Sequence, residues 1–195
     1  MATKLRSATG GFISLFHHRW SVPIIAELYQ SGGTKFITLI HTLALSRDSL
    51  SRTLKSLAVQ KWVTRNPGYG HPMRPEYILT ENGRAIGPFC FDLAQKISEL
   101  SLEEPALKKW SMPLLFAICC SIHRFSDLRE AYPEISPKAL TEALKEMASA
   151  GLIHRVVLDT YPPSVEYHIL TQGLKFCPIL TDLVSALDEV EKSES

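Results

Sequence analysis

The chain has few cysteines and no long apolar run. None of its apolar stretches approaches the roughly 18 consecutive residues that a membrane-spanning helix needs. Met1 to Gly10 holds two basic residues but no apolar segment that ends in small residues, so we expect no secretory signal. The four cysteines have neither the spacing of a zinc site nor that of a disulfide framework. We therefore predict four reduced core thiols, in a cytoplasmic protein that does not bind membranes.

The sequence also lacks the motifs that carry catalysis. It contains no P-loop, no dinucleotide-binding glycine pattern and no His-Glu-x2-His motif. His17 and His18 are adjacent, so they would leave a helix in different directions and do not predict a metal site. The glycines of the segment 68–70 indicate a turn rather than a phosphate cradle. We predict no enzyme, no metal and no cofactor.

An internal repeat is the dominant feature of what is present. The segment Trp20–Ile25 returns ninety positions later as Trp110–Leu115. A period of this length is too long for a solenoid, whose units run about 20 to 50 residues. It matches a small domain, and a hydrophobic content of 45% can fill two modest cores. We predict two similar domains, 11–98 and 101–190.

Charge is divided unevenly between the two halves. The whole chain carries a formal charge of +1, but residues 1–100 hold 12 Lys/Arg against 6 Asp/Glu, which gives +6. Residues 101–195 hold 9 against 14, which gives −5. A basic half indicates contact with an anion such as nucleic acid, and attraction between the two halves is the alternative.

Each repeat is predicted to begin with two helices. Ser21 and Ser111 are the candidate N-caps of the first helix, and each is followed two residues later by a proline in the first turn. The pair Gly32-Gly33 ends this helix in the first copy. A short helix that starts near Phe36 follows it.

A third helix, from Arg47 to Val59, is the most informative element of the first copy. Ser46 is its predicted N-cap. Apolar residues at helical spacing define an inward face: Leu50, Leu54, Leu57 and Ala58. Polar residues define the opposite face: Arg47, Asp48, Ser51, Arg52 and Lys55.

The second copy repeats this helix with a different polar face. Ser136 is the predicted cap and Pro137 the first helical residue. The inward residues are Leu140, Ala143, Leu144 and Met147, and the outward ones are Lys138, Thr141, Glu142 and Lys145. Gly151 then supplies a left-handed stop, and Lys61 occupies the same place in the first copy at some cost in strain.

A two-stranded hairpin and a last helix complete each repeat. Strands are predicted at 62–65 and 76–80 around a turn at 66–72, and again at 152–158 and 165–170. Apolar helices follow at about 83–97 and 173–190. An isolated hairpin is marginal in water, so it must pack on the helices with its tip projecting. The fold class is thus mainly α with small β-hairpins (α+β): tandem winged helix-turn-helix domains.

Each repeat resembles the HxlR group of bacterial transcription regulators, which are relatives of MarR. The resemblance runs from about Phe12 to Leu187. In the first copy an ordered set carries it: Trp20, Phe36, Ser46, Leu50, Leu54, Arg65, Tyr77, Leu79, Thr80 and Gly83. It implies DNA binding and pairing through the first and last helices, here within one chain as an intrachain pseudo-dimer.

The chain departs from the group's pattern in two further ways. The cysteine that many members carry shortly before the tryptophan, and that some use as a redox sensor, is absent here, so that mechanism is not implied. In the second copy the Leu-Thr pair is shifted by one residue to Leu170-Thr171, so we expect its strand end to differ.

The predicted DNA contacts lie mostly in the first copy. A helix fits the major groove, and arginine on such a helix reads guanine or holds phosphate. The predicted set is Ser46, Arg47, Ser51, Arg52, Lys55, Arg65, His71 and Arg74, joined in the second copy by Lys138, Thr141 and Lys145. Acidic residues weaken the second set: Glu134, Glu142, Glu146 and Asp159.

These observations favour a sequence-specific duplex DNA-binding transcription regulator, associated with the nucleoid, that reads DNA mainly through its first repeat. The alternative is a winged-helix protein-interaction module, such as a regulator antagonist, that does not read DNA. A second copy of the chain and another regulator stay open as further partners.

Overall fold

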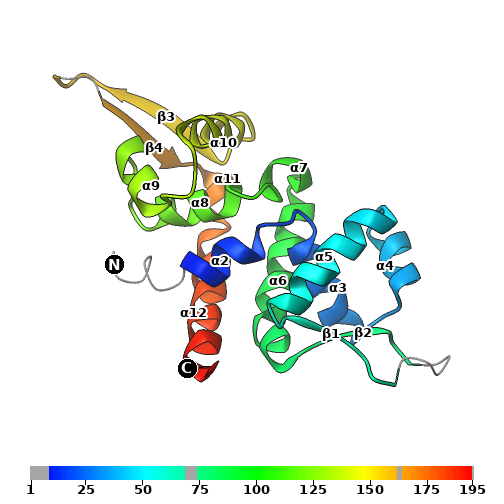
Figure 1. Ribbon diagram of the computed structural model, residues 1–195. Coiled ribbons are helices and arrows are strands. Elements are labelled where there is room, and N and C mark those ends of the chain that lie inside the picture. The colour runs from blue at the N-terminus through cyan, green and yellow to red at the C-terminus, as the bar shows by residue number, and fades with distance from the viewer. Residues whose placement is uncertain (1–8, 69–73, 162–163, 195) are drawn as a thin grey trace.

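The computed structural model describes residues 9–68, 74–161 and 164–194, and the repeat is visible in it as two similar units (Figure 1). The first unit consists of α2 (Thr9–Leu15), α3 (Ser21–Ser31), α4 (Phe36–Thr42), α5 (Arg47–Val59), β1 (Val63–Arg65), β2 (Tyr77–Leu79) and α6 (Glu81–Glu99). The second consists of α7 (Glu103–Ala106), α8 (Ser111–Cys119), α9 (Phe125–Ala131), α10 (Pro137–Ser149), β3 (Ile153–Leu158), β4 (Ser164–Ile169), α11 (Thr171–Leu174) and α12 (Cys177–Glu194).

The two hairpins have the same register. In β1–β2, Val63 pairs with Leu79, and in β3–β4, Ile153 pairs with Ile169, so the two hairpins are equivalent at the end next to the helices. An isolated bridge adds the segment before the short second helix to each hairpin, through Thr34 in the first unit and Arg124 in the second. Figure 1 shows the hairpins projecting from opposite ends of the molecule. The prediction of two winged helix-turn-helix units is confirmed.

α5 and α10 occupy the position that is called the recognition helix in a winged helix-turn-helix fold, and the N-caps predicted for both are confirmed. The Ser46 hydroxyl accepts a hydrogen bond from the Ser49 N–H at 3.2 Å, and that of Ser136 accepts one from Ala139 at the same distance. Each helix is followed by a left-handed residue: Lys61 with φ 59° and Gly151 with φ 71°. The first copy therefore keeps the turn without glycine.

Other local predictions are wrong. Ser21 and Ser111 are the first helical residues of α3 and α8 rather than their caps, and both are buried. The Ser111 hydroxyl turns inward and donates to the Pro105 carbonyl at 2.6 Å, so it leaves the helix terminus without a side-chain cap. Ala58 is exposed because the apolar face of α5 ends at Leu57.

The last helices of the two units differ at their start. The Thr80 hydroxyl caps α6 by accepting from the Gly83 N–H at 3.0 Å. Leu170 occupies the equivalent position in the second unit and has no side chain that can cap. There the chain forms the four-residue α11 and resumes as α12 only at Cys177. The shifted Leu-Thr pair therefore alters the helix start and leaves the strand end unchanged.

Glycine is required where each last helix crosses its hairpin. A Cβ added at Gly83 would lie 2.0 Å from the Trp62 carbonyl oxygen, and one at Gly173 would lie 2.3 Å from that of Leu152. Both obstacles are backbone atoms at the entry to β1 and β3, so they cannot rotate away. The pair of glycines accounts for the close packing of helix on hairpin in both units.

The two units share a helical interface. α6 packs against α3 of its own unit and against α12 of the other, and α12 also contacts α2 and α8. Phe12 of α2 meets Phe116 of α8 edge-on, with ring centroids 5.5 Å apart. Leu183 and Leu187 of α12 are fully buried. The apolar terminal helices therefore partner each other within the chain, as the pseudo-dimer requires.

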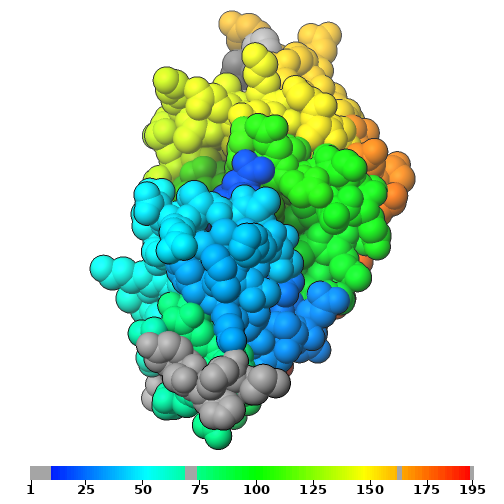
Figure 2. All heavy atoms as spheres, turned by 90° about the vertical axis from the view of Figure 1, so that its right-hand side faces the viewer, coloured from blue at the N-terminus to red at the C-terminus, as the bar shows by residue number. Residues whose placement is uncertain are grey.

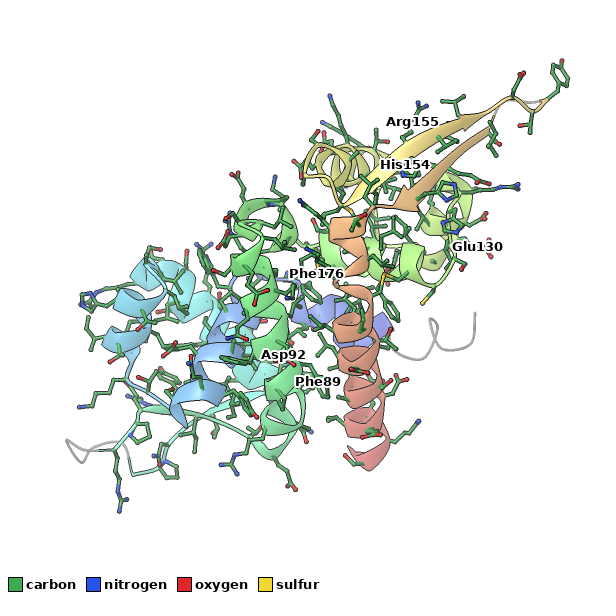
Figure 3. All side chains as sticks on the ribbon, turned by 180° about the vertical axis from the view of Figure 1, so that it is seen from behind. Phe89, Asp92, Glu130, His154, Arg155 and Phe176 are labelled. Atoms are coloured by element: carbon green, nitrogen blue, oxygen red, sulfur yellow. A yellow bond between two sulfur atoms is a disulfide. The ribbon has the colours of Figure 1, made fainter. Side chains whose placement is uncertain are left out.

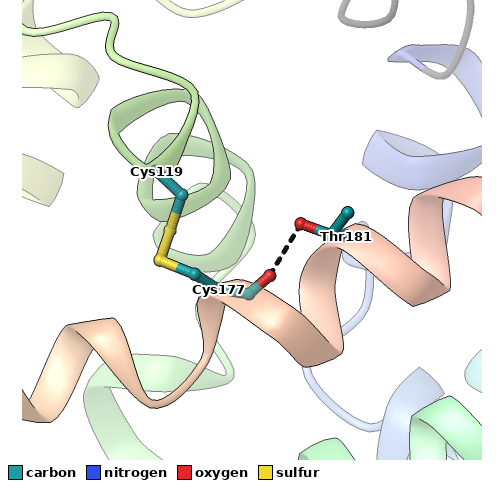
Figure 4. The surroundings of a disulfide bond; sticks show 3 residues. All are labelled: Cys119, Cys177 and Thr181. Carbon is teal, nitrogen blue, oxygen red and sulfur yellow. Dashed lines mark hydrogen bonds between the residues drawn. A yellow bond between two sulfur atoms is a disulfide. The ribbon is translucent and has the colours of Figure 1, made fainter.

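The prediction of four reduced thiols is wrong for two of them. Cys119, at the end of α8, and Cys177, at the start of α12, form a disulfide with their Cα atoms 5.8 Å apart (Figure 4). Cys90 is buried and Cys120 half-buried, and neither is disulfide-bonded. The partners are 58 residues apart, so only the tertiary packing of α12 on α8 brings them together.

The first unit makes a non-covalent contact at the equivalent place. The numbering offset of ninety places Tyr29 and Gly87 where the second unit has Cys119 and Cys177. A Cβ added at Gly87 would lie 2.6 Å from Cδ2 of Tyr29, so the tyrosine ring rests directly on the glycine. The same helix-on-helix approach is thus held by an aromatic ring in one unit and by a disulfide in the other.

Substituting Gly83→Ala should lower the free energy of unfolding by about 1–3 kcal/mol, because the new methyl group displaces backbone rather than a flexible side chain. Urea unfolding followed by circular dichroism measures the change. Gly10→Ala is the matched control, because nothing lies within 4 Å of the Cβ it adds. Equal urea midpoints for the two variants would contradict the close contact between Gly83 and the hairpin backbone.

Cys177→Ser should destabilise the chain by about 2–4 kcal/mol under oxidising conditions, because a disulfide that closes a long loop restricts the unfolded state. A thiol reductant should lower the melting temperature of the wild type and leave that of Cys177→Ser unchanged. Cys120→Ser should keep the reductant response. A wild-type melting temperature that ignores the reductant would count against the disulfide.

Candidate nucleic-acid interface

The first recognition helix presents its polar side chains to solvent. Leu50, Leu54 and Leu57 are buried and anchor α5 in the core. The predicted contact residues on the other side are all exposed: Ser46, Arg47, Ser51, Arg52 and Lys55. Nε of Arg52 donates to the Asp48 carbonyl at 3.3 Å, which orients the guanidinium along the helix surface. The arrangement offers a cationic helix face of the width that a major groove admits.

The first wing is fastened to the body by one carboxylate. Nη2 of Arg65 lies 2.9 Å from Oε1 of Glu76 in an ion pair across the hairpin. Oε2 of Glu76 also accepts from the Phe36 N–H at 3.3 Å, at the start of α4. Arg74 is exposed, whereas His71 lies outside the described residues. Arg65 therefore has a structural partner that the sequence prediction did not anticipate.

A shallow groove brings three of the predicted residues together. Ser51 and Lys55 of α5 and Arg65 of β1 line a groove of about 270 Å³ between the recognition helix and the hairpin. Its remaining walls are mostly apolar and include Phe36 and Tyr77. Helix and wing thus form one continuous surface with two cations along it.

Two histidines lie beside the first recognition helix, although no role was predicted for them. The rings of His17 and His18 meet edge-on with centroids 5.0 Å apart. Burial lowers the pKa of His18, and the nearby charges of His17 and Arg52 lower it further. His18 is therefore a neighbour of Arg52, which only the folded chain reveals because α5 begins about thirty residues later.

The second recognition helix is exposed but surrounded by ion pairs. Lys138 lies 4.0 Å from Glu142 on the same helix, and the Thr141 hydroxyl donates to the Pro137 carbonyl at 2.8 Å. Nζ of Lys108, just after α7, lies 2.8 Å from Oε1 of Glu146. The predicted contacts Lys138, Thr141 and Lys145 therefore face solvent among carboxylates.

The linker between the units lies against α10. A groove of about 490 Å³ separates α7 from α10, and Glu104, Lys145 and Glu146 are among the residues that line it. Figure 2 shows the green linker region between the blue-cyan first unit and the yellow second unit. The acidic α7 thus adds negative charge beside the second recognition helix.

The second wing has longer strands than the first, six residues each against three, and it is less basic. Arg155 is exposed on β3, and no ion pair involves it within the part of the chain that the structure describes (Figure 3). Glu166 of β4 lies 3.4 Å from Nε of Arg124 and 3.1 Å from Nε2 of His168. Val157 and Tyr161 expose apolar surface toward the tip.

Across residues 9–68, 74–161 and 164–194, no group of His, Cys, Asp and Glu side chains is arranged to hold a metal ion. Within the same ranges no helix is both long and apolar enough to cross a membrane.

Comparison with known proteins agrees with this geometry. The HxlR-like helix-turn-helix family model matches residues 15–104 and again 107–194. The chain belongs to this family. It therefore contains two HxlR-like units in tandem.

Individual relatives match over part of their length. An uncharacterised HTH-type transcriptional regulator of Bacillus subtilis (strain 168), YdeP, is 36% identical over 72 residues, which are 37% of this chain and 56% of the relative. One from Methanothermobacter thermautotrophicus is 37% identical over 75 residues, 38% of this chain and 57% of the relative. The chain thus spans a little over half the length of these curated relatives.

A solved structure is also similar to part of the chain. It is described as a transcriptional regulator of the MarR family from Porphyromonas gingivalis W83, is 27% identical, and has a TM-score of 0.39. The match covers 48% of this chain and 85% of that structure.

Proposed function

We propose that this tandem HxlR-like protein is a sequence-specific, duplex DNA-binding transcription regulator that reads DNA mainly through α5 and the first wing. The observation that carries the proposal is the exposed cationic face of α5, anchored by buried leucines in the basic half of the chain. Membership of the HxlR-like helix-turn-helix family supports it, as do relatives that are named HTH-type transcriptional regulators.

The residues of the first unit divide by chemistry. Arg47 and Arg52 near the start of α5 are the candidates for bidentate contacts to guanine. Lys55 and Arg74 suit phosphates, which position the protein without reading sequence. Arg65 is paired with Glu76 and so holds the wing, and its side chain is 54% exposed, which leaves it accessible to the DNA backbone. Ser46, Ser51 and His71 complete the proposed set.

The second unit contributes a weaker half. We place its boundaries at 101–190 and those of the first at 11–98. Glu142 stands where the first unit has Arg52, and Glu146 holds the linker through Lys108. Carboxylates near phosphates reduce affinity, so a single chain prefers a non-palindromic site with a degenerate second half. The DNA contacts proposed for this unit are made by Lys138, Thr141 and Lys145.

A protein-interaction module is the second candidate. The observation that favours it is the second wing, which exposes Val157 and Tyr161 and carries little positive charge. In this alternative the second unit contacts another regulator and the chain antagonises it.

Binding of the full chain to duplex DNA should weaken steeply with salt. Neutralising about 4 to 8 phosphates predicts a slope of log Kobs against log [salt] of roughly −4 to −7. Fluorescence anisotropy of a labelled duplex at several salt concentrations gives the slope. Absence of binding at low salt, or a flat dependence, would support the protein-interaction alternative.

Substitutions at the two equivalent helix positions should affect DNA binding differently. Arg52→Ala should cost about 1–3 kcal/mol of specific binding free energy if the guanidinium reads a base. Glu142→Ala should leave specific affinity unchanged and tighten non-specific binding, because it removes a like charge near phosphate. Affinities on a site selected from random duplexes measure both. A symmetric selected site bound by a single chain would sink the assignment of unequal halves.

A further inference from the structure

Three histidines lie side by side at the base of the second wing. His168 of β4 is central: its ring centroid lies 4.7 Å from that of His123, with the planes 23° apart, and 5.6 Å from that of His154. His154 is the register partner of His168 on β3, and His123 precedes α9 on the other side of β4. We call these three residues the histidine ladder.

Hydrogen bonds fix how the ladder can take up protons. Nδ1 of His123 lies 3.1 Å from the Tyr167 carbonyl oxygen, which can only accept, so Nδ1 carries a hydrogen. Nε2 of His168 lies 3.1 Å from Oε2 of Glu166, so Nε2 carries a hydrogen there. The other nitrogen of each ring, Nε2 of His123 and Nδ1 of His168, remains to bind a second proton. The imidazoles of His123 and His168 can therefore each bind a second proton without losing the present hydrogen bond.

The first unit has no such ladder. The shared register places Thr64 and Ile78 where the second unit has His154 and His168. Thr34 makes the backbone bond to Tyr77 that His123 makes to Tyr167. None of the three residues of the first unit titrates. The ladder therefore distinguishes the unit whose recognition helix is the poorer DNA ligand.

Protonation gives this wing a net positive charge. With neutral histidines, Arg124 and Arg155 balance Asp159 and Glu166, so the wing is uncharged. Three protonated rings would bring it to +3. The elements packed against it add little net charge: α8 carries none, α9 adds Asp127, Arg129 and Glu130, and α10 adds Lys138, Glu142, Lys145 and Glu146.

We infer that the second wing is a conditional DNA-contact surface, which takes the phosphate backbone of duplex DNA when the histidine ladder is protonated. The inference rests on the proposed function. Exposed Arg155 has no ion pair in the described residues, and it follows His154 directly along β3 (Figure 3). Because successive side chains of a strand point to opposite faces, a protonated ladder adds positive charge to the face of the hairpin that Arg155 does not occupy.

Proton and DNA binding are linked in this arrangement. Imidazolium rings at these centroid distances repel one another, and Glu166 is shared between His168 and Arg124. A row of phosphates supplies the missing negative charge, so DNA favours the protonated ladder and the protonated ladder favours DNA by the same factor. Falling pH supplies the protons, so the contact of the second wing with DNA strengthens as the pH falls.

The test compares the full chain with a variant that carries the first unit's residues, His123→Thr/His154→Thr/His168→Ile. Affinity for a duplex that spans both half-sites is measured from pH 8 to pH 5.5 at several salt concentrations. The wild type should bind at least tenfold tighter at the acidic end, with a salt slope steeper by about 1 to 3. The variant should lose this gain, and footprinting should show protection of the second half-site only for the wild type at low pH.

Two controls separate the ladder from other titrations. His17→Gln/His18→Gln removes the histidines beside Arg52, and this variant should retain the steeper slope and the second-half footprint at low pH. Urea unfolding at both ends of the pH range checks that each variant is folded. Binding with the same pH response in the ladder variant overturns the inference and leaves the proposed function standing. No binding at any pH overturns the proposed function itself.

Discussion

The packing of α6 against α12 is the contact on which the arrangement depends. Each helix closes the core of its own unit and offers its remaining apolar side to the other, so neither unit is complete by itself. In the first unit the contact of Tyr29 with Gly87 fixes how closely α3 approaches α6. In the second unit the disulfide of Cys119 and Cys177 does the same for α8 and α12. Both recognition helices take their positions from this shared core.

The two units differ where they meet solvent and are alike where the last helix of each unit meets the backbone of its own hairpin. Gly83 and Gly173 face carbonyl oxygens in the same way, and both hairpins keep one register. The outward positions differ in charge, with Arg52 in one recognition helix and Glu142 in the other. Steric contact with the backbone constrains the glycine positions. The solvent-exposed positions of α5 and α10 are free of this constraint and can carry side chains of different charge.

Local signals allowed much of the fold to be predicted from the sequence. The bounds of α5 and its Ser46 cap follow from periodicity and capping chemistry, which act over a few residues. The Cys119 disulfide, the Arg65 ion pair with Glu76 and the histidine ladder depend on strand register and helix packing between distant segments. No spacing rule connects such partners in a single sequence. The sequence predicts which side chains of α5 are exposed, but it does not predict which residues from other elements lie next to them.

Because residues 100–110 join the two units covalently, their pairing does not depend on the protein concentration. Two separate subunits must meet before they present two heads, so their pairing is lost on dilution. Here the effective concentration of one half around the other is set by the connection and not by the amount of protein. If one chain binds one DNA site as proposed, the occupancy of that site at low concentration rises with the first power of the chain's concentration, as a graded dose response without a dimerisation threshold.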